Sequence, residues 1–150
     1  MSAMYPAPMW SDVTGTTTPS ADALTLLSRG LSPTTDADGV HLLRSGLRQL
    51  RAELREHVAA MEGPGGFYDE VRRDEPRLCC AVARLRREHG RLCAMVDDLD
   101  RWMSRDDVDK KTLPDARPRV RELLEQWGNH RHRDNQLAYE ALSLDLGGQD

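Results

Sequence analysis

Three long segments of this sequence carry apolar residues at alternating steps of three and four positions. A spacing near 3.5 residues places side chains on one face of an α-helix, where they pack against neighbouring helices. No segment alternates apolar and polar residues in the way that indicates a β-strand. The sequence therefore predicts an all-α fold, an antiparallel up-and-down helical bundle. The three stripes are Leu43, Leu47, Leu50, Leu54 and Met61; Leu78, Val82, Leu85, Leu92, Val96, Leu99 and Met103; and Val120, Leu123, Trp127, Leu137 and Ala141.

The stripes and the residues that interrupt them predict where each helix begins and ends. We expect long helices over residues 40–61, over residues 76–103 and from near Pro118 to the glycines at 147–148. A Gly-Pro-Gly-Gly break follows the first helix, a corner at Asp74-Glu75-Pro76 precedes the second, and a polar loop precedes the third. Residues 67–73 or residues 21–30 supply a shorter fourth element.

Residues 1–38 differ from the rest of the chain because they are rich in Thr, Ser, Pro, Ala and Gly and lack a sustained period. This composition is typical of segments that bury too little apolar surface to fold alone. We therefore expect a disordered or weakly structured tail over 1–38 and a helical domain over 39–150. Within the tail, Ser20 is a candidate cap for a short helix with Leu24 and Leu27 on one face.

Charge and cysteine content exclude several classes of protein. The net charge of -4 is unlike that of a general nucleic-acid binder. No stretch is long and apolar enough to cross a membrane, and the first residues do not resemble a secretory signal. Three cysteines, Cys79, Cys80 and Cys93, do not form a disulfide framework. We therefore expect a cytoplasmic protein without nucleic-acid or membrane partners.

Three stripe positions hold histidine instead of an apolar residue, one in each long helix: His57, His89 and His130. Asp134 follows His130 by one helical turn and shares its face. The midpoints between successive histidines fall at the corner before Pro76 and in the polar loop before the third helix. Antiparallel helices bring residues level when they are equidistant from the turn, so we expect the three imidazoles to converge beside Asp134.

Clustered histidines and carboxylates inside helical bundles are typical of iron, manganese or zinc sites. The sequence therefore favours a metal site of His57, His89, His130 and Asp134. In the alternative interpretation, each histidine is satisfied by a carboxylate of Glu62, Glu88 or Asp134 without metal. The remaining histidines, His41 and His132, are expected on outer faces.

Several sequence segments resemble those of the hemerythrin-like, or HHE cation-binding, family. They are Leu54-Arg-Glu-His57 with the downstream group Glu62 to Tyr68, Leu85-Arg-Arg-Glu-His89-Gly-Arg-Leu92, and the segment from Leu123 to Asp134. The last twelve residues resemble a bacterial subgroup. The resemblance covers residues 40–150 and implies a four-helix bundle that holds a non-haem iron centre of one or two ions. It also implies binding or sensing of O2 or a related small molecule.

The ligand set departs from the family pattern at three places, one of which is that no histidine precedes His41 to serve as the family's first-helix ligand. Met61 stands where a carboxylate usually follows His57, with Glu62 one residue further on as a candidate oxygen ligand, and Cys93 replaces a second histidine after His89. A degenerate, metal-free bundle acting as a protein-interaction module is therefore the alternative function, with no indicated partner.

Other features carry less weight. The sequence has no phosphate-binding loop and no activated nucleophile, so we expect binding rather than catalysis. Tyr68 and Tyr139 are candidate hydrogen-bond donors to the ligands. A basic stripe is expected on a solvated face, with an acidic partner as the alternative; it consists of Arg44, Arg48, Arg51 and Arg55.

Overall fold

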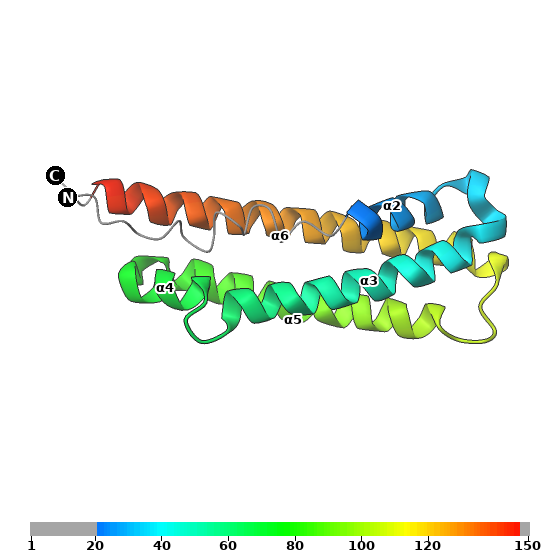
Figure 1. Ribbon diagram of the computed structural model, residues 1–150, viewed down its shortest axis with the longest axis horizontal. Helices are drawn as coiled ribbons and strands as arrows, with labels where there is room; N and C mark the ends of the chain where they lie inside the picture. Colours follow the sequence, from blue (N-terminus) through cyan, green and yellow to red (C-terminus); the bar gives the residue numbers. More distant parts are fainter. Residues whose placement is uncertain (1–20, 148–150) are drawn as a thin grey trace.

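The computed structural model describes residues 21–147, and within that range every regular element is a helix (Figure 1). The predicted all-α bundle is confirmed. None of the described helices is long and apolar enough to cross a membrane. The α-helices are α2 (Ala21–Gly30), α3 (Asp36–Glu62), α4 (Phe67–Asp74), α5 (Cys79–Met103) and α6 (Leu113–Gly147), with 3-10 turns at Pro33–Thr35, Pro76–Leu78 and Lys110–Thr112.

The third long helix begins earlier than expected. The sequence placed its start near Pro118, but α6 begins at Leu113 and Pro118 lies inside it. The reason is a capping box just ahead of the helix: the Asp109 side chain accepts from the Lys111 amide, and Thr112 Oγ1 accepts from the Asp109 amide. These bonds satisfy the amide groups of Asp109 and Lys111, so the helix can begin ahead of Pro118.

The expected tail boundary at residue 38 is corrected, because residues 21–38 form α2, a 3-10 turn and the first residues of α3. Ala23 and Leu27 of α2 are fully buried, whereas Leu24 is half-buried. Gly46 of α3 permits the close approach, since a Cβ there would lie 2.6 Å from the Leu27 side chain. Residues 1–20, including the expected cap Ser20, lie outside the described residues.

A buried arginine fixes the end of the bundle where α2 lies. Arg117 of α6 is 8% exposed and donates to the carbonyl oxygens of Gly30 and Ser32, at 3.0 Å each, and to Asp36 Oδ1 at 2.7 Å. Gly30 ends α2, so the guanidinium satisfies a carbonyl that has no partner within its own helix. Arg117 thereby links α2, α6 and the start of α3.

Buried apolar side chains form two clusters separated by the histidines. The larger joins α2, α3, α5 and α6 and includes Leu54, Leu92 and Trp127. The smaller gathers around α4, at the opposite end from α2 in Figure 1, and includes Met61, Phe67, Tyr68, Val71, Val82, Leu85, Leu137 and Ala141. In each long helix the histidine lies between a residue of one cluster and a residue of the other.

Part of the basic stripe on α3 lies against α5 and the loop after it, whereas Arg48 and Arg55 are exposed. Arg44 donates to the carbonyl oxygens of Met103 and Arg105, and Arg51 Nε donates to Asp97 Oδ1 at 2.6 Å. Arg55 also approaches Asp97, at 3.6 Å. The described contacts therefore give this part of the stripe a structural role between helices.

Candidate metal centre

Four buried side chains from three helices meet between the two apolar clusters. His57 comes from α3, His89 from α5, and His130 and Asp134 from α6, and none is more than 4% exposed. One donor atom from each residue lies within 4.8 Å of the other three. The imidazole centroids are 4.6–5.6 Å apart. The convergence expected from the helix spacing is therefore present in the structure.

Asp134 lies at the middle of this group. Its Oδ2 is 3.1 Å from His57 Nε2 and 3.0 Å from His130 Nε2. Neighbouring ligands at right angles around an ion, each about 2.1 Å from it, stand about 3.0 Å apart. These two separations therefore suit adjacent ligands of one ion.

Two glutamates hold the outer nitrogens of two imidazoles. His89 Nδ1 lies 3.0 Å from Glu62 Oε1, and His130 Nδ1 lies 3.0 Å from Glu88 Oε1. A carboxylate that accepts from Nδ1–H places the proton on that nitrogen and leaves the Nε2 lone pair for a metal. Glu62, which the sequence suggested as a direct ligand, lies in this outer layer, because its carboxylate contacts the outer Nδ1 of His89 and Glu62 is not one of the four residues of the group.

The contact between His130 and Asp134 needs either a proton or a metal ion between its two atoms. His130 Nε2 is 3.0 Å from Asp134 Oδ2 but has no hydrogen-bond partner among the described residues. With Nδ1–H directed to Glu88, the Nε2 lone pair and the carboxylate oxygen face each other across this short distance. Such a contact between two acceptors is repulsive unless a proton or a metal ion lies between them. The residues present therefore fit a metal ion.

Tyr68 of α4 closes the side of the group next to the smaller cluster. Its hydroxyl is fully buried, donates to Asp134 Oδ1 at 2.5 Å and lies 3.4 Å from His89 Nε2. The other candidate from the sequence, Tyr139, is 73% exposed and plays no such part. The helical spacing could not distinguish these two tyrosines, because the Gly-Pro-Gly-Gly break before Tyr68 interrupts the stripe and leaves the direction of its side chain undetermined.

Burial and neighbouring charges shift the pKa values of His89, His130 and Asp134 in different directions. Burial, with the nearby His130 and His57, lowers the pKa of His89 to about 3. Burial also lowers the pKa of His130, but Asp134 and Glu88 outweigh it and raise that pKa overall. The pKa of Asp134 is held well below its usual range because the imidazoles of His130 and His57, at 3.0 and 3.1 Å from its Oδ2, outweigh burial. The centre thus combines an ionised carboxylate with a neutral His89.

Burial and neighbouring groups also determine the charge of Glu88 in the outer layer and of Tyr68. Burial acts to raise the pKa of Glu88, but hydrogen bonds from Arg133 and His130 outweigh it and lower that pKa. Burial, with the nearby Asp134, raises the pKa of Tyr68 far above its usual value. Tyr68 therefore remains a neutral hydrogen-bond donor.

Trp127 covers the group on the side of the larger cluster. Its indole stacks on His130, with centroids 5.8 Å apart and planes 14° apart, and meets the edge of His57 at 5.0 Å. Trp127 is 4% exposed. It therefore helps to exclude water from the imidazoles.

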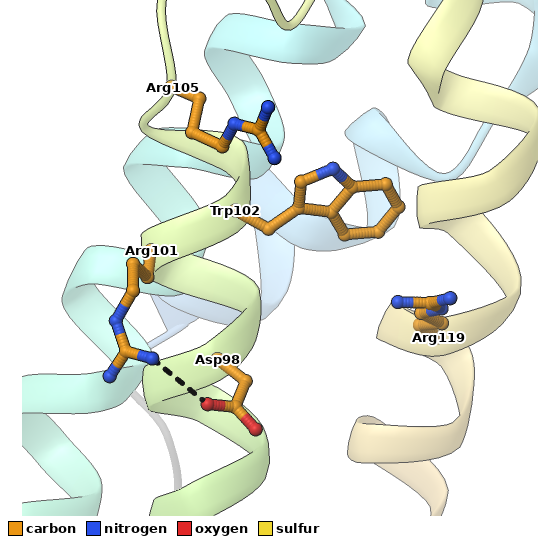
Figure 2. A pocket seen from close by; sticks show the side chains of 5 residues that line it. All are labelled: Asp98, Arg101, Trp102, Arg105 and Arg119. Atoms are coloured by element: carbon orange, nitrogen blue, oxygen red, sulfur yellow. Dashed lines mark hydrogen bonds and ion pairs between the residues drawn. The ribbon is translucent and has the colours of Figure 1, made fainter.

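The other candidates lie away from the centre. Cys93 is half-buried and packs against the larger apolar cluster, Met61 belongs to the smaller cluster, and His41 and His132 are exposed. An open depression of about 460 Å³ also lies apart from the four-residue group. Figure 2 shows Trp102 of α5 in this depression, facing α6, and its other lining residues are Asp98, Arg101, Arg105 and Arg119.

Comparison with known proteins agrees with this architecture. The family model of the hemerythrin HHE cation-binding domain matches residues 21–142, a range that includes α2 as well as α3, α5 and most of α6. No curated protein and no solved structure matched the chain. The matched range and the buried His/Asp group together support a metal-binding domain. The chain belongs to the hemerythrin HHE cation-binding domain family.

Proposed function

We propose that this protein binds one non-haem iron ion through His57, His89, His130 and Asp134. The observation that carries this proposal is the unpaired contact between His130 Nε2 and Asp134 Oδ2, which a cation would stabilise. The Nδ1 atoms of His89 and His130 face glutamates, so their Nε2 atoms are the available donors. The resulting set is three imidazole nitrogens and one carboxylate oxygen.

The donor types support iron. Imidazole binds zinc, copper, nickel and iron, whereas carboxylate oxygen suits harder ions, and no thiolate belongs to the group. A mixed nitrogen and oxygen set is typical of non-haem iron. Glu62 and Glu88 each contact an imidazole Nδ1, which leaves Asp134 as the carboxylate of the group that faces its centre. This arrangement favours one ion over two.

We propose that the ion serves to bind or sense O2 or a related small molecule. A six-coordinate ion held by four protein donors retains up to two further positions for small ligands. Bound iron would supply a redox-active centre for such ligands, while Trp127 and the two apolar clusters exclude bulk water from it. The three cysteines are free, which suits a reducing compartment, so we place the protein in the cytoplasm.

Metal analysis and thermal unfolding test the proposal. Protein purified under reducing conditions should contain about one iron per chain, and Fe(II) should raise the melting temperature of the metal-free form because it binds only the folded state. His89→Ala should abolish this shift, and the exposed control His41→Ala should retain it.

The opposite results are equally informative. Substoichiometric metal and no Fe(II) shift would refute the metal-binding proposal and favour the metal-free interaction module. Equal effects of His89→Ala and His41→Ala would refute the assigned ligands. A larger shift with Zn(II) or Mn(II) than with Fe(II), in matched titrations, would replace iron with that metal.

A further inference from the structure

The hydroxyl of Tyr68 makes one hydrogen bond that determines how Asp134 can act as a ligand. Tyr68 Oη donates to Asp134 Oδ1 at 2.5 Å, while Asp134 Oδ2 faces His57 and His130 at 3.1 and 3.0 Å. The two carboxylate oxygens are therefore directed to different partners. One faces the centre and the other faces the tyrosine.

Loss of this hydrogen bond would change the coordination of the ion. A carboxylate with both oxygens available binds a metal through one oxygen or through two. Because Tyr68 engages Oδ1, Asp134 offers one oxygen and takes up one coordination position. Tyr68 is fully buried in the smaller apolar cluster, so its ring is held in place by packing and water does not replace its hydroxyl.

The charge around the ion indicates which small ligands would occupy the position that remains. The group contains one carboxylate, and the outer nitrogens of His89 and His130 are directed to glutamates, so a metal at their Nε2 atoms would meet neutral imidazoles. A divalent or trivalent ion held by this set keeps a net positive charge, which attracts anions. Of the two outer carboxylates, Glu88 is neutralised by Arg133 at 2.8 Å, and the charge of Glu62 is partly screened by solvent because its side chain is 30% exposed. A small anion is therefore the favoured class of ligand.

We propose that Tyr68 is a positioning residue that keeps Asp134 bound through one oxygen and so preserves a coordination position for a small anion. The inference rests on the proposed metal site. It adds a residue outside the ligand set. Its consequence is that removal of one hydroxyl should close one coordination position without removing the metal.

Cobalt(II) and azide provide a test that does not depend on activity. The visible absorption of Co(II) is intense with four or five ligands and weak with six, so it reports the coordination number. In Tyr68→Phe, Asp134 should bind through both oxygens, the Co(II) absorption should fall, and azide should bind about tenfold more weakly, at the lower end of the effects seen for partners of metal ligands. Cobalt stoichiometry should stay at one per chain.

Two further variants complete the experiment. Tyr139→Phe removes the hydroxyl of an exposed tyrosine and should leave the spectrum and the azide affinity unchanged. Placing p-aminophenylalanine at position 68 restores a donor to Asp134 Oδ1 and should restore both signals. This variant also keeps the test valid if Tyr68→Phe does not fold.

The outcomes separate this inference from the metal site on which it rests. If the wild-type protein binds neither iron nor cobalt, the proposed function fails. If the wild type and Tyr68→Phe both bind cobalt with the same spectrum and the same azide affinity, the metal site stands and the role of Tyr68 is refuted. A weakened azide affinity that p-aminophenylalanine does not restore would also refute it.

Discussion

The two ends of this bundle are held together by different kinds of contact. Around α2, the contacts are close apolar packing and capping: Leu27 packs against Gly46. Arg117 donates hydrogen bonds to the carbonyl oxygens of Gly30 and Ser32, where α2 ends. Toward α4, the helices meet across imidazoles and a carboxylate that are buried as deeply as the leucines. The first arrangement gains from burial of apolar surface, whereas the second has a desolvation cost that only a correct set of partners offsets. The α2 end therefore provides stability, and the layer of histidines between the two apolar clusters provides chemistry.

The largest effect is expected at the α2 end. Leu27→Ala removes a fully buried side chain and should lower the free energy of unfolding by about 2–5 kcal/mol, as core truncations do. Urea unfolding of the metal-free protein measures this loss, and Leu24→Ala, at a half-buried position of the same helix, is the control. Iron affinity should be unchanged. A parallel loss of iron affinity would show that the two ends are not independent.

The next effect concerns the glutamates behind the imidazoles. Glu88→Gln should weaken metal affinity by about 10–100-fold, the range for outer partners of ligating histidines, because His130 loses its charged partner. Glu62→Gln should have a smaller effect, since the Glu62 side chain is 30% exposed and that of Glu88 only 5%. Competition with a chelator measures both affinities, and the exposed Glu56→Gln is the control. The reverse order would contradict the idea that burial sets the strength of these contacts.

A smaller and more gradual effect is expected with pH. The pKa of His89 is about 3 in the folded protein and near 6.5 when unfolded, so the unfolded chain takes up a proton first as the pH falls. His89 therefore lowers the free energy of unfolding by up to about 1.4 kcal/mol for each pH unit between these values. The raised pKa of His130 acts in the opposite direction, adding stability at low pH that is lost as the pH rises through that pKa.

Comparison of variants isolates the contribution of His89. Urea unfolding of the metal-free protein between pH 7 and about pH 4 should show a shallower loss in His89→Gln than in the wild type. The exposed His132→Gln should keep the wild-type slope. Parallel curves for His89→Gln and the wild type would contradict the neutral, desolvated state assigned to this imidazole.

The sequence was sufficient to predict the three long helices and the convergence of His57, His89 and His130, because both depend on regular spacing along a helix. It assigned the residues of α2 to a tail, although it named residues 21–30 as a candidate helix, because the contact of Leu27 with Gly46 is distant in sequence and the surrounding composition is that of a tail. The start of α6 was missed because a capping box outweighed Pro118.

The outer layer of the centre was harder to predict than the four central residues. Glu62 is the last residue of α3, so its direction is not determined by the helical stripe. Tyr68 enters through a turn in which Gly65 adopts a φ of +72°, a conformation that side chains other than glycine rarely take. Neither orientation follows from periodicity, because each depends on the path of the chain between α3 and α4.

The stacking of Trp127 on His130 has an optical consequence. The chain has three tryptophans: Trp10 lies outside the described residues, Trp102 is half-buried at a distant surface, and Trp127 contacts two imidazoles of the centre. Paramagnetic ions quench nearby indole emission, so the fluorescence of Trp127 should follow occupancy of the centre while that of Trp102 provides a steady background. The molecule thus contains its own fluorescent reporter, which requires no attached dye.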